Sequence, residues 1–293
     1  MKKLRGGLVA ATVVVLGLST VPATAGTAQP GQPGTAQVCP EIVVLAARGS
    51  EQNDHLEPTS YSPDSPWVSN GYEAENIRAF LHYAEARHRE QAGTSLLADV
   101  QVIGLDDSVY PARLPVPALA ERGENLDMSQ AGSRVGEILR QTPAHVIAQD
   151  AVGGLLGGLE SGITGTMGYV DAWETRTGCS PGYILIGFSQ GAVVLIPQEP
   201  WLKERGQLIA SLYLGNPLHP VVGAGPSRSD SLSYCIDGDF ACNLNSSTGQ
   251  TALANGGGVH DEYFGAVDGQ QREGDGEVAD RFAGWITGYN PQA

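Results

Sequence analysis

Residues 183–194 decide the fold, and they read YILIGFSQGAVV. The apolar run Tyr183–Ile186 leads directly into the pentapeptide Gly187–Gly191, and an apolar helix start follows at Ala192–Val194. A serine between glycines, where a strand turns into a helix, is typical of a nucleophile elbow that exposes the hydroxyl above a sheet. An ordinary glycine-rich turn is the alternative. We interpret Ser189 as a nucleophile, because the flanking glycines let two backbone segments approach closely.

Four further apolar runs extend this pattern along the chain. They are continuous rather than alternating, which is typical of strands covered on both faces of a parallel sheet. The runs lie at 42–45, 100–103, 209–214 and 232–235, and helical patterns lie at about 71–91, 129–139, 168–175 and 277–287. Strands that alternate with helices predict an α/β fold, a single-domain doubly wound sheet of five mainly parallel strands with right-handed crossovers.

The first helical pattern carries a predicted cap and a predicted buried face. Asn70 is expected to cap the helix, with Glu73 reaching back to it. The apolar face would consist of Ile77, Phe80, Leu81 and Ala84. This spacing is typical of a helix that packs on a sheet.

The segment His145–Gly168 departs from the rhythm of strands and helices, because it is rich in glycine and in small and aliphatic residues. One interpretation is a mobile lid or an acyl-chain wall beside the active site. The other is a close-packed surface helix or an ordered loop. The acidic residues Asp150 and Glu160 exclude a membrane-spanning segment.

Residues 1–25 have the organisation of a secretory signal peptide. A basic head precedes the apolar run Leu8–Leu18, and the small residues Ala23–Ala25 follow. A retained membrane anchor is the alternative, but the run is short for a span. Residues 26–38 have the composition of a disordered leader, so we expect one folded domain over 39–293. The prediction is a secreted, extracellular protein.

The formal net charge of −15 argues against nucleic acid and anionic lipid as partners. No later run is apolar for long enough to span a bilayer, so we expect no stable membrane anchor. We also expect a monomer. The four cysteines, an even number, favour two disulfides in an exported chain: Cys39, Cys179, Cys235 and Cys242. None has the C-x-x-C spacing of a zinc ribbon. Asn245–Ser247 is a glycosylation sequon whose use depends on the host.

A serine nucleophile needs a base, and the base needs an orienting acid. On a sheet with a nucleophile elbow, the acid and then the histidine follow the serine along the chain. Of the histidines after Ser189, His219 precedes the acid candidates, whereas His260 follows the last predicted strand in a glycine-rich loop and is the better base. Asp237 and Asp239 lie at the expected place of the acid. A polar turn is the alternative there, and the spaced ligands of a calcium loop are missing.

The tetrahedral intermediate of acyl transfer needs two donors aimed at its oxyanion. The backbone N–H of Gln190, directly after the nucleophile, is the first candidate. The second is expected after the first strand, in Ala47–Ser50, where Ser50 offers both its backbone N–H and its hydroxyl. Alternatively, Arg48 and Ser50 only shape a turn.

Taken together, these motifs resemble the cutinase family of secreted serine esterases. The resemblance rests first on Ala47–Ser50, soon after a cysteine and a strand, and on Cys179, a few residues before Gly187–Ala192. It rests further on the loop Cys235–Cys242, which contains Asp239 and is followed by His260. The motifs follow one another in the order expected for the family.

The resemblance implies an α/β-hydrolase that needs no cofactor and no metal. The implied triad is Ser189, Asp239 and His260. The implied oxyanion donors are Ser50 and Gln190. The implied disulfides are Cys39–Cys179 and Cys235–Cys242. Family members hydrolyse esters of cutin, lipids, acetylated xylan or synthetic polyesters. We therefore expect a carboxylic ester hydrolase that forms an acyl-enzyme and acts on lipid, cutin-like or polyester esters.

The chain also departs from the family pattern around the expected substrate groove. Pro197 and Pro200 should interrupt the helix after the nucleophile. The loop 52–69 is long, and 145–168 has the character of an insertion. The interrupted helix and Leu214–Pro217 suggest an alternative, a cell-wall mycolyl or acetyl-polysaccharide esterase. An alternative from another class is a catalytically silent secreted lipid- or glycan-binding protein with the same fold.

Overall fold

The computed structural model describes most of the chain after its first residues. The described ranges are 38–114, 128–219, 230–243, 245–254, 259–266 and 269–291. The chain divides into two units, 1–37 and 38–293, and all described residues belong to the second. The predicted signal peptide, and all of the predicted leader except Val38, lie outside the described residues.

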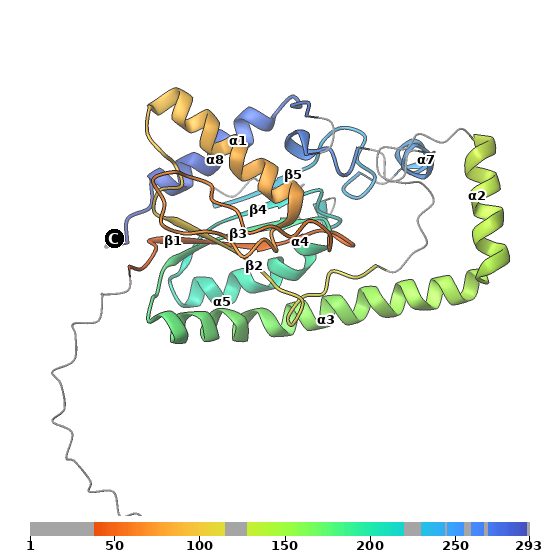
Figure 1. Cartoon of the computed structure of the whole chain (residues 1–293), viewed down its shortest axis with the longest axis horizontal. Coiled ribbons are helices and arrows are strands. Elements are labelled where there is room, and N and C mark those ends of the chain that lie inside the picture. The colour runs from red at the N-terminus through yellow and green to blue at the C-terminus, as the bar shows by residue number, and fades with distance from the viewer. Residues whose placement is uncertain are drawn as a thin grey trace, which may run out of the picture. The chain divides into compact units, whose positions relative to one another are not determined.

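A five-stranded sheet forms the centre of the domain (Figure 1). Its strands are β1 (Ile42–Ala47), β2 (Val100–Gly104), β3 (Gly182–Phe188), β4 (Leu208–Leu214) and β5 (Ser231–Tyr234). They lie in the order β2-β1-β3-β4-β5, and every neighbouring pair is parallel. Every residue of β1 and β3 is buried, as coverage on both faces requires. The predicted fold class, a doubly wound α/β sheet of five strands, is confirmed.

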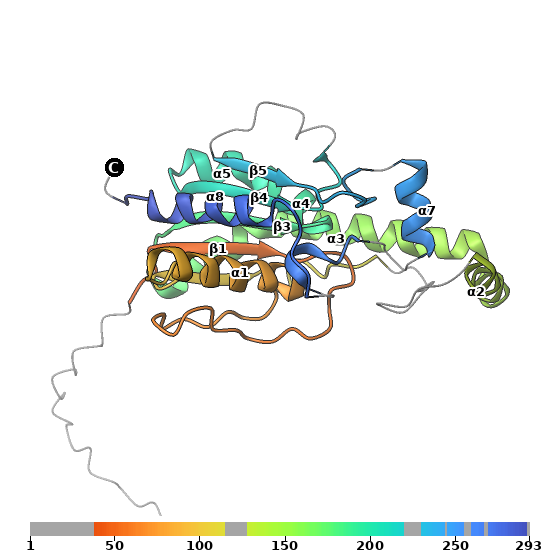
Figure 2. The same cartoon turned by 90° about the horizontal axis from the view of Figure 1, so that it is seen from above.

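Helices cover both faces of this sheet (Figures 1 and 2). Packed on one face are α1 (Ala74–Ala92) and α8 (Asp275–Thr287), and on the other α3 (Ala144–Thr177), α4 (Gln190–Leu195) and α5 (Glu199–Glu204). The remaining elements are α2 (Met128–Gln141), α7 (Ser246–Ala254) and the short 3₁₀ helices η1 (Ile196–Gln198) and η2 (Tyr263–Gly265). Within the described ranges, no helix is both long and apolar enough to cross a membrane.

The predicted apolar face of α1 is confirmed, but its predicted cap is wrong. The helix begins at Ala74, and Glu73 makes no side-chain cap. Asn70 instead pairs with Gly104 at the end of β2, accepting from its N–H at 2.8 Å and donating to its carbonyl at 2.7 Å. The buried members of the face are Ile77, Phe80, Leu81 and Ala84. The side chain that was expected to cap the helix therefore ties the preceding loop to the sheet.

The glycine-rich segment 145–168 lies entirely within the 34-residue helix α3. Its second half packs closely, since a Cβ at Gly162 would lie 2.9 Å from Cγ1 of Val194 in α4. Its first half carries the exposed side chains of Val152 and Leu156. The interpretation as a packed helix is therefore correct for the second half, where glycine allows two helices to approach.

The helix after the nucleophile is interrupted, as the prolines predict. After the six residues of α4 the chain forms η1, which contains Pro197, and then α5, which has Pro200 in its first turn. Proline has no backbone N–H, so neither residue can continue the hydrogen bonding of one long helix.

Two disulfides tie the domain together. One joins Cys39 to Cys179, with 5.5 Å between their Cα atoms, and the other joins Cys235 to Cys242, with 5.9 Å. The first links the entries to the adjacent strands β1 and β3. Both pairings agree with those that the resemblance implies.

Candidate active site

The carboxyl ends of β1 and β3 mark the point where the strand order reverses, which is where open α/β sheets place their sites. Ser189 follows β3 directly and has φ 52° and ψ −120°, a backbone conformation that is rare outside glycine. A Cβ at Gly187 would lie 2.6 Å from Cα of Ala192, and one at Gly191 would lie 2.0 Å from the carbonyl oxygen of Ala47. Glycine is therefore required on both sides of this serine.

Three predicted side chains meet at this point. The Ser189 hydroxyl lies 2.8 Å from Nε2 of His260, and Nδ1 of His260 lies 2.9 Å and 3.0 Å from the carboxylate oxygens of Asp239. His260 is 9 % exposed and Asp239 is fully buried. With Nδ1 protonated, Nε2 can accept the serine proton while the carboxylate accepts the hydrogen bond from Nδ1.

Both carboxylate oxygens of Asp239 have further donors. The Ala241 N–H donates to Oδ1 at 2.8 Å, and the Tyr263 hydroxyl donates to Oδ2 at 2.6 Å. Burial raises the pKa of Asp239, but the hydrogen bond and charge of His260 and the Tyr263 hydroxyl outweigh it, so this pKa lies below its usual value. Burial and the charge of Asp239 raise the pKa of Tyr263 well above its usual value. The carboxylate therefore stays ionised beside a protonated phenol.

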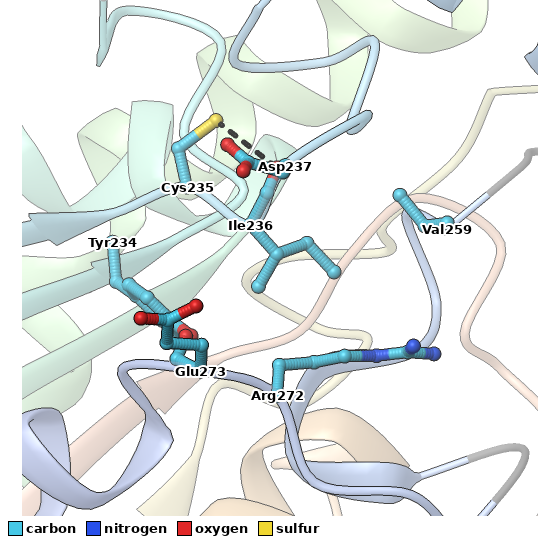
Figure 3. Close-up of a pocket in the computed structure, with 7 residues that line it drawn as sticks. All are labelled: Tyr234, Cys235, Ile236, Asp237, Val259, Arg272 and Glu273. Atoms are coloured by element: carbon cyan, nitrogen blue, oxygen red, sulfur yellow. Dashed lines mark hydrogen bonds between the residues drawn. The ribbon is translucent and has the colours of Figure 1, made fainter.

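Asp237 lies at a different place from its neighbour Asp239. It is exposed, and it lines a separate cavity of about 360 Å³ together with Tyr234, Val259 and Arg272 (Figure 3). Asp239, two residues later, turns inward to His260. The structure thus brings Asp239 and not Asp237 to the histidine, the alternative that the sequence left open.

His219, the other histidine after Ser189, contacts β5. Its Nδ1 lies 2.9 Å from the hydroxyl of Ser233.

One cluster has the residue types of a metal site. Cys235, Asp239 and Cys242 bring ligand atoms within 4.8 Å of one another. Because both sulfurs belong to one disulfide, they cannot serve as thiolate ligands of a metal.

The two predicted oxyanion residues are in direct contact. The Ser50 hydroxyl donates to the side-chain oxygen of Gln190 at 2.9 Å, which ties the loop after β1 to the start of α4. Gln190 is the first residue of α4, and the first N–H groups of a helix have no acceptor within it. Both residues line the same cavity as Ser189. The structure therefore brings the two predicted oxyanion residues together beside Ser189.

Arg48 anchors the loop that carries Ser50. Its guanidinium is fully buried and donates to the carbonyl of Leu105 at 2.8 Å and to the side chain of Asn53 at 2.9 and 2.7 Å. It also pairs with Asp107 at 2.5 Å. Arg48 thus shapes this loop, which is the role that the sequence left open as an alternative. It also holds the loop against the segment after β2.

A cavity of about 540 Å³ opens beside the triad, with Ser189, His260, Ser50 and Gln190 in its lining. Most of its other lining residues are apolar and include Leu114, Leu155, Leu159, Val193, Pro217 and Phe240. Leu155 and Leu159 belong to α3, so part of the segment 145–168 is a wall of this cavity. Apolar lining with a few polar groups is typical of small-molecule sites.

Sequence reasoning missed two residues that touch the triad. Tyr263 bonds to Asp239, and Gly215 follows β4 with φ +56° against the ring of His260. Tyr263 lies three residues after the predicted base, and Gly215 directly follows a predicted strand. The position of Gly215 directly after a predicted strand could have indicated a site residue, because strand ends of this fold carry such residues.

No family model matches the chain, and no curated protein matches it. Solved structures that are similar include Trichoderma reesei cutinase in complex with a C11Y4 phosphonate inhibitor, with a TM-score of 0.42 and 14 % identity over 86 % of this chain and 78 % of that one. A cutinase-like protein from Cryptococcus sp. has a TM-score of 0.37 and 16 % identity over 87 % of this chain and 98 % of that one. At these values the likeness does not assign the chain to a family.

Proposed function

We propose that this chain is a secreted carboxylic ester hydrolase that works through an acyl-enzyme on Ser189. The observation that carries the proposal is the hydrogen-bonded chain from Ser189 through His260 to Asp239, with distances of 2.8 and 2.9 Å, beside a largely apolar cavity. A nucleophile, its base and the group that orients the base are the parts that acyl transfer requires.

In the first half of the reaction, Nε2 of His260 accepts the Ser189 proton while Oγ bonds to the ester carbonyl carbon. The carbonyl electrons move to oxygen, and the N–H groups of Gln190 and Ser50 stabilise the resulting oxyanion. Asp239 accepts the hydrogen bond from Nδ1 and stabilises the imidazolium. The intermediate then breaks its bond to the alcohol oxygen, which receives the proton from His260.

In the second half, water replaces the alcohol. His260 takes a proton from a water molecule while the water oxygen bonds to the acyl carbon. The N–H groups of Gln190 and Ser50 stabilise the second oxyanion. Collapse breaks the bond to Oγ of Ser189, which regains its proton from His260. The acid leaves and the enzyme returns to its starting state.

The largely apolar cavity supports esters of the lipid, cutin-like or polyester kind as substrates. The two disulfides support secretion, because such bonds persist in oxidising compartments. The basic, apolar and small residues of 1–25 support the same conclusion.

Hydrolysis of p-nitrophenyl butyrate tests this function. We expect turnover by the wild type and a loss of about 10⁶-fold in kcat in Ser189→Ala, because removing one member disables the whole unit. A fluorophosphonate probe should label Ser189. Absence of turnover in the folded wild type, or labelling of another serine, would contradict the proposal and favour a lipid- or glycan-binding protein.

A further inference from the structure

Helix α3 contributes two leucines to the cavity beside Ser189. Leu155 and Leu159 are four residues apart, so they project from the same face of the helix, and both line the cavity. On the same helix, Val152 and Leu156 are 55 % and 59 % exposed. The helix therefore has one apolar pair on the cavity and another in solvent.

Close packing fixes this part of α3 against the site. A Cβ at Gly158 would lie 3.5 Å from Nε2 of Gln190, the residue after the nucleophile. The Ser161 hydroxyl donates to the carbonyl of Val109 at 2.7 Å, and the side chain of Gln198 donates to the carbonyl of Ile163 at 2.9 Å. Because these contacts begin one residue before Leu159, the position of the two leucines relative to Ser189 is set by the core.

Two parts of the cavity lining lie next to different residues of the site. The ring of Phe240 lies 5.3 Å from that of His260, whereas α3 packs over Gln190. His260 protonates the departing alcohol, so the alcohol leaves next to the imidazole, which Phe240 contacts. The acyl group stays on Ser189, which precedes Gln190, and α3 is the lining helix that contacts Gln190.

We propose that Leu155 and Leu159 form the acyl-binding wall, and that the enzyme selects esters of aliphatic acids of medium or long chain over acetyl esters. This inference rests on the proposed ester hydrolase function. The cavity of about 540 Å³ holds an extended aliphatic chain. Each methylene that leaves water for this wall raises kcat/KM by about fourfold, up to the length of the wall.

The test compares p-nitrophenyl acetate with p-nitrophenyl octanoate, which share one alcohol and differ only in the acyl chain. In the wild type, kcat/KM for octanoate should exceed that for acetate by about tenfold or more. The double variant Leu155→Ala/Leu159→Ala should lower this ratio about tenfold, because octanoate reaches the wall and acetate does not. Leu156→Ala, on the exposed side of the same helix, is the matched control and should leave the ratio unchanged.

Leu159→Met keeps the volume of the wall and should keep the octanoate preference. Leu159→Trp should also lower the octanoate-to-acetate ratio, because its ring would block long chains, and it provides a second measurement if the double alanine variant does not fold. Wild-type protein that hydrolyses neither ester overturns the proposed function and this inference together. Hydrolysis of both esters, with the same ratio in the wild type and the wall variants, overturns only the acyl wall. An equal change in Leu156→Ala also overturns it, because the helix as a whole would then be responsible.

Discussion

Gly215 lies against His260 so closely that a Cβ at residue 215 would be 2.7 Å from Cε1 of the imidazole and 3.1 Å from Oδ2 of Asp239. The glycine has φ +56°, and its N–H donates to the carbonyl of Tyr234 at 3.0 Å. Gly215, directly after β4, thus packs against both the histidine and its acid. The distance between base and nucleophile depends on this residue having no side chain.

Gly215→Ala should lower kcat for p-nitrophenyl butyrate by about a hundredfold, because a methyl group would push His260 away from Ser189 and misplacement near 1 Å has this cost. Gly206→Ala is the matched control, since Gly206 has φ +68° but nothing within 4 Å of its Cβ position. Backbone strain should lower the unfolding free energy of both variants by about 1 kcal/mol, with a further loss in Gly215→Ala from the contact with His260. The control should keep its activity. Equal activity in the two variants would show that Gly215 does not position the histidine.

Asp239→Asn should lower kcat by about 10⁴-fold in a folded protein, because the imidazole loses the partner that orients it and stabilises its charge. Asp237→Asn, in the same loop but exposed, should cost less than about tenfold. Steady-state kinetics on p-nitrophenyl butyrate, with thermal melts of both variants, decide the comparison. A crippled Asp237→Asn beside an active Asp239→Asn would contradict the assignment of the acid.

The lowered pKa of Asp239 predicts a specific dependence of stability on pH. A carboxyl whose pKa is lower in the folded state stabilises the protein above its unfolded value, about 3.9, and this stabilisation is lost as pH falls through the folded value. The difference in unfolding free energy between wild type and Asp239→Asn should therefore change below about pH 4, in the direction of a relative loss by the wild type. Urea titrations at pH 6 and pH 3 measure it. A difference that stays constant would show that this carboxyl has an ordinary pKa in the folded protein.

Tyr263→Phe should lower kcat/KM by roughly tenfold to a hundredfold, because a hydrogen bond to a buried carboxylate is lost. The Tyr263 hydrogen bond lowers the pKa of Asp239, so without this donor that pKa should rise and the acid limb of the pH profile of kcat/KM should move to higher pH. Tyr234→Phe is the matched control, since its hydroxyl bonds to Asp275 outside the triad. An unshifted profile in Tyr263→Phe would mean that this tyrosine only supports packing.

Replacing Cys39 and Cys179 by serine should lower the unfolding free energy by about 2–5 kcal/mol, because their disulfide closes a loop of 140 residues. Denaturant titration of wild type and double variant measures the change, and the residual activity at low temperature should stay close to wild type. Non-reducing peptide mapping that joins Cys39 to Cys235 or Cys242 would contradict the pairing.

The sequence by itself predicted the strands, the elbow and the order of the chemical residues, because these depend on local patterns. Continuous apolar runs are needed for strands that are buried on both faces. Glycines are needed where the chain turns at Ser189 from β3 into α4. The buried face of α1 followed from helical spacing alone.

Tertiary structure decided what local patterns leave open. Asn70 could cap α1 or bond to Gly104, and it bonds to Gly104 because β2 places both backbone groups within its reach. Glycines weaken a helix, so the sequence left residues 145–168 open between a packed helix, an ordered loop and a lid or acyl-chain wall. The structure shows a helix, and the missing side chain of Gly162 allows its close approach to α4.

The acid, likewise, could be Asp237 or Asp239, since both are carboxylates in one short loop. Only contacts with His260 and Tyr263, which come from distant parts of the chain, select Asp239. The position of Leu155 and Leu159 beside Ser189 likewise depends on packing between distant parts of the chain. Residue types and their spacing thus determine which chemistry the chain can carry, whereas the packing of remote segments determines which of several similar side chains performs it.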